Sequence, residues 1–298
     1  MSKIEKYRKI CKAVQYAGMI VIMGAGMFFV WWFGFKNKPE DGTGMEMMTP
    51  LMITILVLFA FMIFVTAPMQ SKLLRLVILA SLDGLVEDVK FDKKKGYNKD
   101  SFMKLNYTSQ PFEKYGCADY YSFKLGDKIV ESTTARAYDE FKIPRQKGKK
   151  GSKGGKKTVN YFYGRIYILP FESEFKFNVL GKKSPTASRK KEFSTTEYNN
   201  EYPIKIKKYY ENFEIFYKGE KPTTDIQTLL EKLLTLKIQS KGTVSIYVRN
   251  KSMVILVDNN RHYEELEIKK PIDEAIVRSY RKDVNMVVNF INGLKEYK

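Results

Sequence analysis

A short segment at residues 147–158, KGKKGSKGGKKT, has six lysines among glycines and no acidic residue. Lysine and glycine together are typical of loops that bind phosphate, and the nucleotide-binding P-loop has the pattern Gly-x-x-x-x-Gly-Lys-Ser/Thr. The segment departs from this pattern, because Lys156 stands where the second glycine should follow Gly151, and no Ser or Thr follows Gly155-Lys156. Residues 160–169 are typical of a strand, whereas a P-loop opens a helix. The sequence therefore does not predict ATP binding here.

The same basic segment, residues 145–158, is predicted to be a flexible surface loop that contacts an anionic surface. A membrane is the simplest such surface, since each Lys or Arg near anionic headgroups contributes about 1 kcal/mol of attraction. The alternative is that the charges only keep a mobile hairpin soluble. The residues expected to contact the anion are Arg145, Lys147, Lys149, Lys150, Lys153, Lys156 and Lys157. A second basic stretch, residues 181–200, is also predicted to be a flexible surface loop.

Catalytic chemistry has little support in the sequence. Cys117 and the single histidine, His262, would form a nucleophile–base pair only with a third group to orient the imidazole. Cys117 stands at the start of a strand pattern, where a small buried thiol is the commoner role, and His262 lies in a polar connection. Glu172 and Glu174 fall on the solvent side of a strand pattern, as surface residues do. No catalytic residue is therefore predicted.

Metal and cofactor sites are not predicted either. Two cysteines and one histidine cannot supply the four nitrogen or sulfur ligands of a structural zinc site. Met45, Met47 and Met48 offer thioethers that suit copper(I), but three methionines without Cys or His are a weak ligand set. Apolar side chains at a membrane boundary are the favoured interpretation of these methionines. The expected cofactor content is therefore none.

Composition sets wider limits on the protein. The chain has 298 residues, enough for one large or two modest domains. Its formal charge of +19 points to an anionic partner surface. Aromatic residues make up 14% of the chain. A packed globular portion is therefore expected, and wholesale disorder is not.

Two apolar stretches near the N-terminus are predicted to cross a membrane. Residues 17–35 are nineteen residues without a charge, and residues 51–67 are seventeen, whereas a membrane-spanning helix needs about 20. A cleaved signal peptide is disfavoured, because the first stretch ends in Trp31-Trp32 and not in small residues. Tryptophans suit the membrane interface, and Pro50 suits the first turn of the second helix. A transmembrane helical hairpin is therefore expected.

The distribution of Lys and Arg orients this hairpin. Seven basic residues flank it within residues 3–12 and 72–75, whereas the loop at 36–50 has only Lys36 and Lys38. Basic residues favour the cytoplasmic side, so both termini of this multi-pass membrane protein are expected in the cytoplasm. The expected organisation is a basic N-terminus at 1–16, the hairpin at 17–67 with spans at 17–35 and 51–67, a connecting helix at 68–90 and a cytoplasmic domain at 91–298.

The region after residue 90 is predicted to be an α+β domain with a mainly antiparallel sheet. Apolar–polar alternation and aromatic residues indicate its strands, and Gly126-Asp127 is a two-residue hairpin signal. The strands cluster without regular alternation with helices, which favours this architecture over a doubly wound one. The predicted strands are residues 119–125, 129–132, 160–171, 171–179, 212–217, 243–249 and 253–258, the last two joined at Asn250-Lys251.

Apolar residues at helical spacing predict two helices in this domain, at residues 224–238 and 272–294. A further pattern concerns the strand at 160–171, whose side chains alternate between two faces. One face carries Phe162, Gly164, Ile166 and Ile168, and the other carries Tyr161, Tyr163, Arg165, Tyr167, Leu169 and Phe171. The second face is similar to a platform on which nucleic-acid bases stack. A sheet face packed under a helix explains it equally well.

With the two apolar spans, five segments resemble a bacterial membrane-protein family known as domain of unknown function 3137. They are FDKKKGYNKDSF (91–102), DYYSFKLGDKIVES (119–132), YFYGRIYILPFESEFKF (161–177), FEIFYKGE (213–220) and KPIDE (270–274). The similarity covers most of residues 10–295, but the motifs are strand patterns that identify a fold more than a chemistry. The resemblance implies a bacterial inner-membrane protein whose gene often lies near genes of the LemA family of membrane proteins. It supplies no catalytic residues.

The favoured function is a membrane-anchored cytoplasmic module that binds or scaffolds a partner without catalysis. The expected partners are the lipid bilayer, anionic lipid headgroups and a membrane protein of the LemA type. A membrane-tethered nucleic-acid-binding protein is the alternative. A hydrolase is the least favoured function.

Overall fold

The computed structural model describes residues 2–32, 36, 45–92, 95–143, 155–193, 196–222, 226–249, 251–260, 272 and 274–294. The chain divides into two compact units. One comprises Met1–Asp83 with Glu265–Arg281, and the other comprises Gly84–Glu264 with Lys282–Lys298. This division differs from the expected boundary at residue 91, because a late segment of the chain belongs with the N-terminal helices.

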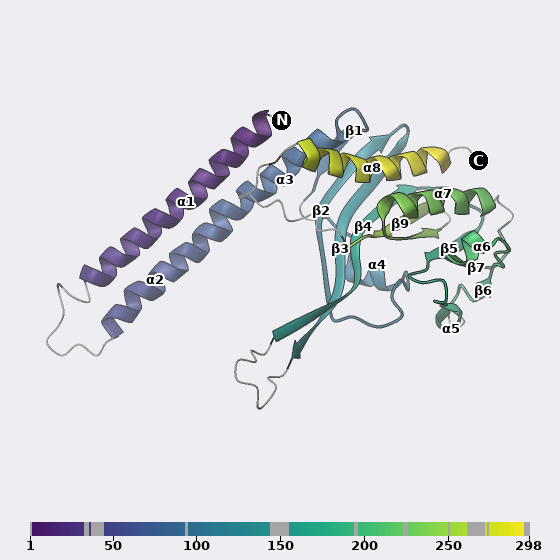
Figure 1. Cartoon of the computed structure of the whole chain (residues 1–298), viewed down its shortest axis with the longest axis horizontal. Helices are drawn as coiled ribbons and strands as arrows, with labels where there is room; N and C mark the ends of the chain where they lie inside the picture. The colour runs from purple at the N-terminus through teal and green to yellow at the C-terminus, as the bar shows by residue number, and fades with distance from the viewer. Residues whose placement is uncertain are drawn as a thin grey trace. The chain divides into compact units, whose positions relative to one another are not determined.

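The first unit contains the two helices that the sequence predicted to be apolar enough for a membrane (Figure 1). Its N-terminal elements are α1 (Ser2–Trp31), α2 (Met45–Phe61), the π-helical turn η2 (Met62–Thr66) and α3 (Ala67–Leu82). The helical stretches Lys3–Trp31 and Met48–Leu82 are long and apolar enough to cross a membrane. Their large side chains face outward, with Ile20 70%, Leu56 63% and Phe64 76% exposed. Such exposure is costly in water and is expected in lipid.

Helices α2 and α3 form one continuous helix, joined by a π-helical turn. Pro68 lacks a backbone N–H and cannot complete regular α-helical hydrogen bonding, and the N–H of Ala67 bonds instead to the carbonyl of Met62. The connecting helix predicted at 68–90 is present, but it is shorter than expected at its C-terminal end. It continues the second span without a break, and it ends at Leu82 because Gly84 takes a left-handed φ of 69°.

Small residues let α1 and α2 approach closely, as is common in membrane helices. A Cβ atom on Gly26 would lie 2.4 Å from the hydroxyl of Thr54, and one on Gly18 would lie 2.1 Å from the ring of Phe61. At the other end of α1, Cys11 is buried and belongs to an apolar cluster of the same unit. The cluster consists of Ile4, Cys11, Leu73, Val77 and Ile272.

The second unit is built on one antiparallel sheet, which confirms the predicted α+β architecture with a large antiparallel sheet. Among the described residues, nine strands pair in the order β1-β2-β3-β4-β9-β8-β5-β7-β6. Antiparallel strands need only short turns between neighbours. The strands are β1 (Glu87–Phe91), β2 (Lys114–Leu125), β3 (Lys128–Ile143), β4 (Gly155–Pro170), β5 (Lys176–Gly181), β6 (Asn200–Glu201), β7 (Phe213–Lys218), β8 (Thr243–Val248) and β9 (Ser252–Asp258).

Both hairpins expected from the sequence are present. Leu125 pairs with Lys128 across the turn between β2 and β3, and Gly126 has the positive φ, 62°, that a Gly-first turn requires. Strands β8 and β9 pair along their length. The strand predicted at 171–179 begins only at Lys176. Before it, the Ser173 hydroxyl bonds to the backbone of Phe175 in a local turn that replaces the sheet ladder.

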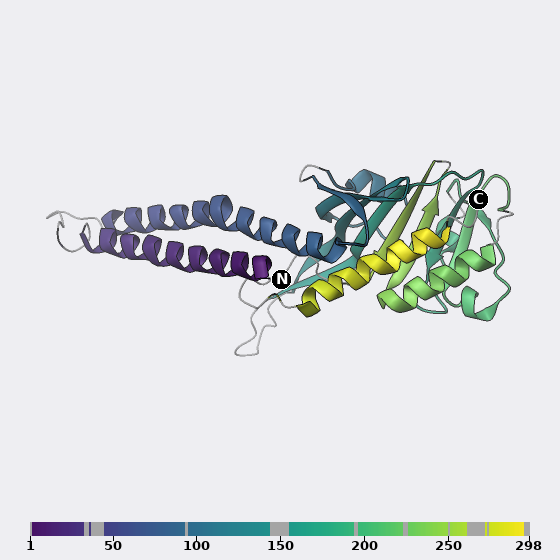
Figure 2. The same cartoon turned by 90° about the horizontal axis from the view of Figure 1, so that it is seen from above.

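Helices cover both faces of the sheet. Helix α7 (Ile226–Ser240) and the part of α8 (Glu274–Leu294) that belongs to this unit, from Lys282 onward, lie over one face, and α4 (Lys99–Met103) lies on the other (Figures 1 and 2). The short helices α5 (Lys190–Phe193) and α6 (Lys207–Tyr210) flank the far strands. Because both faces are covered, β8 and β9 are apolar on both sides, with Val244–Val248 and Met253–Val257 all buried.

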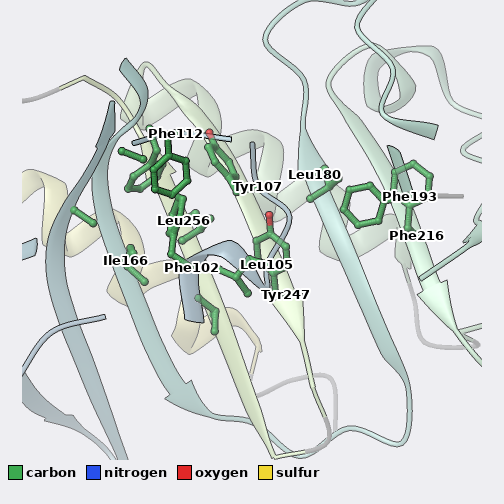
Figure 3. Close-up of a cluster of buried hydrophobic side chains, with 14 residues drawn as sticks. Phe102, Leu105, Tyr107, Phe112, Ile166, Leu180, Phe193, Phe216, Tyr247 and Leu256 are labelled. Atoms are coloured by element: carbon green, nitrogen blue, oxygen red, sulfur yellow. The ribbon is translucent and has the colours of Figure 1, made fainter. Parts of the chain in front are cut away.

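The core on the α4 side is rich in aromatic rings (Figure 3). Phe102 of α4 lies 5.3 Å from Phe162 and 5.8 Å from Phe112 between ring centroids. Ile166 and Ile168 pack in the same cluster. The predicted face of β4 is therefore confirmed for these apolar residues. The buried hydroxyl of Tyr247 in this cluster has no hydrogen-bond partner within the described chain.

Candidate anion-binding sites

Strands β3 and β4 continue beyond the rest of the sheet as a two-stranded ribbon (Figure 1). Strand β2 pairs with β3 as far as Tyr138, and β9 pairs with β4 as far as Gly164. Beyond these points, residues 139–143 of β3 pair with residues 155–159 of β4 and with no other described strand. These two segments are called the ribbon below. Both of its edges therefore expose backbone groups to the surroundings.

The ribbon contains the end of the basic segment. Lys156 and Lys157 are exposed residues of β4, so this part is strand and not the flexible loop that we expected. The strand begins at Gly155 because its ladder with β3 continues to the pair Ile143–Gly155. The other predicted contact residues, Arg145, Lys147, Lys149, Lys150 and Lys153, lie outside the described residues.

Positive charges face each other across the ribbon. Lys142 lies opposite Lys156, and Phe141 lies opposite Lys157. Residues directly opposite in antiparallel strands share a face, and like charges in such a pair destabilise it. All four side chains are exposed, including the ring of Phe141 at 51%. One face thus presents two lysines and the other presents a lysine beside an aromatic ring, and an anion bound there would relieve the repulsion.

Glu140 offsets only part of this charge. Its carboxylate accepts a hydrogen bond from Lys114 at 2.6 Å and lies 4.0 Å from Lys156. The hydrogen bond from Lys114 is the main reason that the pKa of Glu140 is lowered, and it raises the pKa of Lys114. Lys142 and Lys157 have no carboxylate partner in the part of the chain that the structure describes. The ribbon therefore keeps an excess of positive charge.

The base of the ribbon is held by polar contacts. The carboxylate of Asp139 accepts hydrogen bonds from the backbone N–H of Glu113 at 2.7 Å and from the hydroxyl of Tyr161 at 2.9 Å. The guanidinium of Arg136 lies over the rings of Tyr138 and Tyr163, at 4.5 and 5.0 Å. These contacts fix the direction in which the ribbon leaves the sheet.

The tyrosine-rich face of β4 does not form an open stacking platform. Tyr163, Arg165 and Tyr167 are 4%, 2% and 1% exposed. Arg165 donates a hydrogen bond to Ser132 at 3.2 Å and lies 5.1 Å from the ring of Tyr121. Bases cannot stack on rings that are covered in this way. Burial of these residues favours the alternative interpretation of this pattern, a sheet face packed under a helix.

The other residues considered for chemistry are not brought together. Cys117 is exposed on β2, which differs from the buried role expected for it, and His262 lies outside the described residues. Glu172 and Glu174 are exposed, in a segment that is not part of a strand. Within the described residues, no group of three His, Cys, Asp or Glu side chains could hold a metal ion. The side chains of Met45 and Met47, which were considered as copper(I) ligands, are not among those that the structure describes.

A cavity of about 300 Å³ opens beside the middle of β4 and the end of β5. It lies in the second stretch predicted to be a flexible loop, residues 181–200, which the structure shows to be anchored. Its wall includes Tyr107, Tyr161, Leu180, Lys183 and Glu214. These residues come from segments far apart in the sequence, so their grouping depends on the fold.

Arg189 anchors this loop with hydrogen bonds from nearly every nitrogen. Its guanidinium donates to the backbone carbonyls of Asn106 and Tyr107 and, at 2.7 Å, to the carboxylate of Glu192. Its backbone N–H donates to Glu214 at 2.8 Å. Charge-assisted bonds of this kind are about twice as strong as neutral ones. Arg189 therefore builds the cavity wall and holds both carboxylates of the cavity.

Two backbone positions shape the floor of the cavity. The N–H of Gly181 donates to the hydroxyl of Ser245 at 2.9 Å. A Cβ atom on Gly181 would lie 2.3 Å from the carbonyl oxygen of Val244. Only glycine therefore lets the end of β5 approach β8 this closely.

The opposite wall has a buried tyrosine and a loosely held lysine. The hydroxyl of Tyr107 donates to Asp258 at 2.8 Å, and burial, reinforced by Asp258, raises the pKa of Tyr107 well above its usual range. The ammonium of Lys183 lies 3.5 Å from Asp258 and donates to the carbonyl of Tyr161 at 3.3 Å. Its side chain is 62% exposed, so this lysine can turn toward a bound anion at little cost.

The lysines of this loop were evident in the sequence, but the cavity was not predicted. The pattern in the sequence that could have indicated a binding site is Gly181, followed by two lysines and several residues with hydroxyl side chains. That pattern alone does not reveal Tyr107, Glu214 or Ser245, which the sheet brings to the same place.

The fold and these sites define an α+β protein that combines a large antiparallel sheet, helices able to cross a membrane, and two basic surfaces. Comparison of the chain with protein-family models, with curated proteins and with solved structures finds no match.

Proposed function

We propose that the protein is a membrane-anchored, non-enzymatic binding or scaffolding module whose basic ribbon docks on anionic lipid headgroups. The observation that supports this most is the ribbon itself, which pairs with no other described strand and carries Lys142 opposite Lys156. Neighbouring lysines that repel each other gain when an anion lies between them. The exposed ring of Phe141 on the other face suits the boundary between headgroups and acyl chains.

The energetics favour a membrane over a small soluble anion for this surface. Each basic residue near an anionic leaflet contributes about 1 kcal/mol, and the attraction falls off within a Debye length. Three described lysines lie on the ribbon, and five more basic residues occupy the adjoining positions 145–153 of the sequence. Several weak contacts spread over such a length match a broad charged surface better than one small ion.

Two helices able to cross a bilayer supply the anchor. In the proposed arrangement, α1 and the continuous α2–α3 helix form a hairpin in a bacterial inner membrane, with both termini in the cytoplasm. The basis is the excess of Lys and Arg flanking the hairpin over the loop that connects its helices. Lys36 lies 4.4 Å from the ring of Trp32, a pairing that suits a membrane interface.

A protein partner is the other part of the proposal. The resemblance to domain of unknown function 3137 remains a prediction, and with it the expectation of a membrane protein of the LemA type as partner. Nucleic acid is the second candidate ligand of the ribbon, because phosphates of either kind attract lysines. Burial of Tyr163 and Tyr167 removes most of the stacking surface that this alternative would use.

The proposed topology can be tested with the protein's own cysteines. Cys117 is exposed and Cys11 is buried, so Cys117 reports the side on which the sheet lies. We expect a membrane-impermeant maleimide to leave the native protein unlabelled in intact cells and to label it after lysis. In a Cys117→Ser background, Thr43→Cys should be labelled in intact cells. Labelling of native Cys117 in intact cells would place the sheet outside the cytoplasm and overturn the orientation.

Docking on lipid can be tested with full-length protein in nanodiscs of neutral lipid. We expect the protein to bind vesicles that contain phosphatidylglycerol and to ignore neutral vesicles. Replacing Lys147, Lys149, Lys150, Lys153, Lys156 and Lys157 with Gln should weaken binding at least tenfold, because about 1 kcal/mol per charge adds across several contacts. Vesicle flotation measures the bound fraction, and high salt should mimic the substitutions as screening increases.

A control variant separates the ribbon from net charge. Lys205, Lys207, Lys208, Lys221, Lys241 and Lys251 are exposed lysines outside the ribbon, and changing all six to Gln removes the same total charge. This control should bind vesicles nearly as well as the parent. Equal loss in both variants would mean that overall charge, and not the ribbon, drives binding. Tight, salt-resistant binding of a homopolymer RNA would instead favour the nucleic-acid alternative.

A further inference from the structure

The cavity beside β4 and β5 has the size of a small-molecule site. Its volume of about 300 Å³ is at the lower end of the range for ligand pockets. None of the ribbon residues 139–143 or 155–159 lines it. Any ligand of the cavity is therefore separate from the surface that we propose for lipid docking.

The floor of the cavity combines an apolar wall with hydrogen-bonding groups. Leu180 and Tyr107 are 2% and 8% exposed and extend from the aromatic core (Figure 3). Beside them, Ser245 and Glu214 are 1% and 8% exposed. One carboxylate oxygen of Glu214 accepts the backbone N–H of Arg189, and its other oxygen has no partner among the described residues. This second oxygen is not among the buried atoms that lack a partner, so it is accessible and can accept a hydrogen bond from a ligand hydroxyl.

The rim of the cavity has the opposite character. It carries the ammonium groups of Lys182 and Lys183 and the hydroxyls of Thr108, Ser109 and Ser188. Lys182 donates to the backbone carbonyl of Tyr210 at 3.1 Å and has no carboxylate partner in the described chain. Lysine and hydroxyl groups together are common ligands of a phosphate group.

Charged residues of both signs line the cavity. Its lining has three cations, Lys182, Lys183 and Arg189, and two carboxylates, Glu192 and Glu214. Arg189 bonds to both carboxylates and Lys183 lies 3.5 Å from Asp258, which leaves Lys182 without a carboxylate partner in the described chain. A ligand that matches this pattern has an anionic group at one end and hydroxyl donors at the other.

From these observations we infer that the cavity binds a small phosphate ester of a polyol. The phosphate lies at the rim between Lys182 and Lys183, and the polyol hydroxyls donate to Glu214 and exchange hydrogen bonds with Ser245. Glycerol phosphate has this chemistry, both as a soluble metabolite and as the headgroup of a phospholipid. The binding needs no covalent step.

The test is calorimetric titration of full-length protein in neutral detergent. We expect saturable binding of glycerol 3-phosphate, at least tenfold tighter than that of inorganic phosphate or glycerol, because neither of these fills both ends of the cavity. A competing arm adds vesicles that contain phosphatidylglycerol. Vesicles that displace the soluble ester identify the lipid headgroup as the source, and vesicles that leave it bound identify the soluble ester.

Three variants locate the site. Lys183→Gln should weaken glycerol 3-phosphate at least tenfold, whereas Glu214→Gln should reduce the preference for the ester over inorganic phosphate. Ala187→Trp, at the partly exposed wall, should fill the cavity and abolish binding without disturbing buried contacts. The matched control Lys251→Gln, on an exposed turn, should bind normally.

The result also separates this inference from the proposed function. A variant with Lys156→Gln and Lys157→Gln should bind glycerol 3-phosphate like the parent, since these residues do not line the cavity. The inference is overturned by absence of saturable binding, or by equal binding in the parent and the Ala187→Trp variant. Neither outcome affects docking of the ribbon on vesicles.

Discussion

Replacing Gly164 with alanine is expected to destabilise the sheet by about 3 kcal/mol or more. Gly164 lies where β4 pairs with Asp258 of β9, and a Cβ atom there would lie 1.8 Å from the carbonyl oxygen of Val257. The clash is with backbone, so it cannot be relieved by rotating a side chain. The strand must move, and with it Asp258, which accepts hydrogen bonds from the backbone of Tyr163 and the hydroxyl of Tyr107.

Gly116 provides the matched control, because it lies in β2 of the same sheet and a Cβ there meets nothing within 4 Å. Gly116→Ala should change stability by less than about 1 kcal/mol, and in the stabilising direction if anything. Chemical denaturation of both variants, followed by circular dichroism, measures the difference. Equal stability of the two variants would mean that β4 and β9 are not as close as the structure places them.

Alkaline pH is expected to unfold the sheet cooperatively. Burial raises the pKa of Tyr97 to about 12, and it also raises the pKa values of Tyr107, Tyr115 and Tyr247. In the unfolded chain these hydroxyls lose their protons near the ordinary value of 10.0. The stability contributed by the neutral tyrosines is therefore fully present below pH 10 and is lost as pH rises toward the folded values.

The expected size follows from proton linkage. Each buried tyrosine lowers the free energy of unfolding by about 1.4 kcal/mol per pH unit in this window, so the two fully buried ones, Tyr107 and Tyr247, together cost about 3 kcal/mol per unit. Tyrosinate absorbance and circular dichroism should change at the same pH. Tyr247→Phe should move the transition to higher pH, since it removes one such group and a hydroxyl without a partner. Gradual titration near pH 10 with the fold intact would contradict the prediction.

Local patterns in the sequence were enough to predict several elements. The turn at Gly126, the β8–β9 hairpin and helices α7 and α8 follow from alternation, helical spacing and turn residues, which act over a few positions. The end of α3 had a comparable signal in Asp83-Gly84, which marks a helix C-terminus. The length of the second helix was harder to predict, because the uncharged stretch ends at residue 67 whereas the helix continues through the π-helical turn to Leu82.

Local patterns in the sequence do not predict the candidate sites, because these sites depend on contacts between distant segments. Lys156 and Lys157 were identified from composition, but their place in a strand depends on a ladder with β3 that the sequence of β4 alone does not reveal. The cavity was missed because its walls come from β4, β5, β7, β8 and two loops. Residues brought together by strand order have no short spacing in the sequence. Burial of Tyr163 and Tyr167 likewise depends on which helices cover the sheet.

The order of strands in the sheet also has a consequence for synthesis of the protein. Strand β4 finds its second neighbour only in β9, and Tyr163 and Asp258, which bond across this boundary, are 95 residues apart. During translation, β2, β3 and β4 can form their meander early, while the free edge of β4 waits until nearly the whole chain has been made. Contacts so distant in sequence slow folding, and an open apolar edge attracts other strands. The edge of β4 in the nascent chain therefore stays unpaired for a long time. During this time, a chaperone that shields strand edges would determine the yield of folded protein.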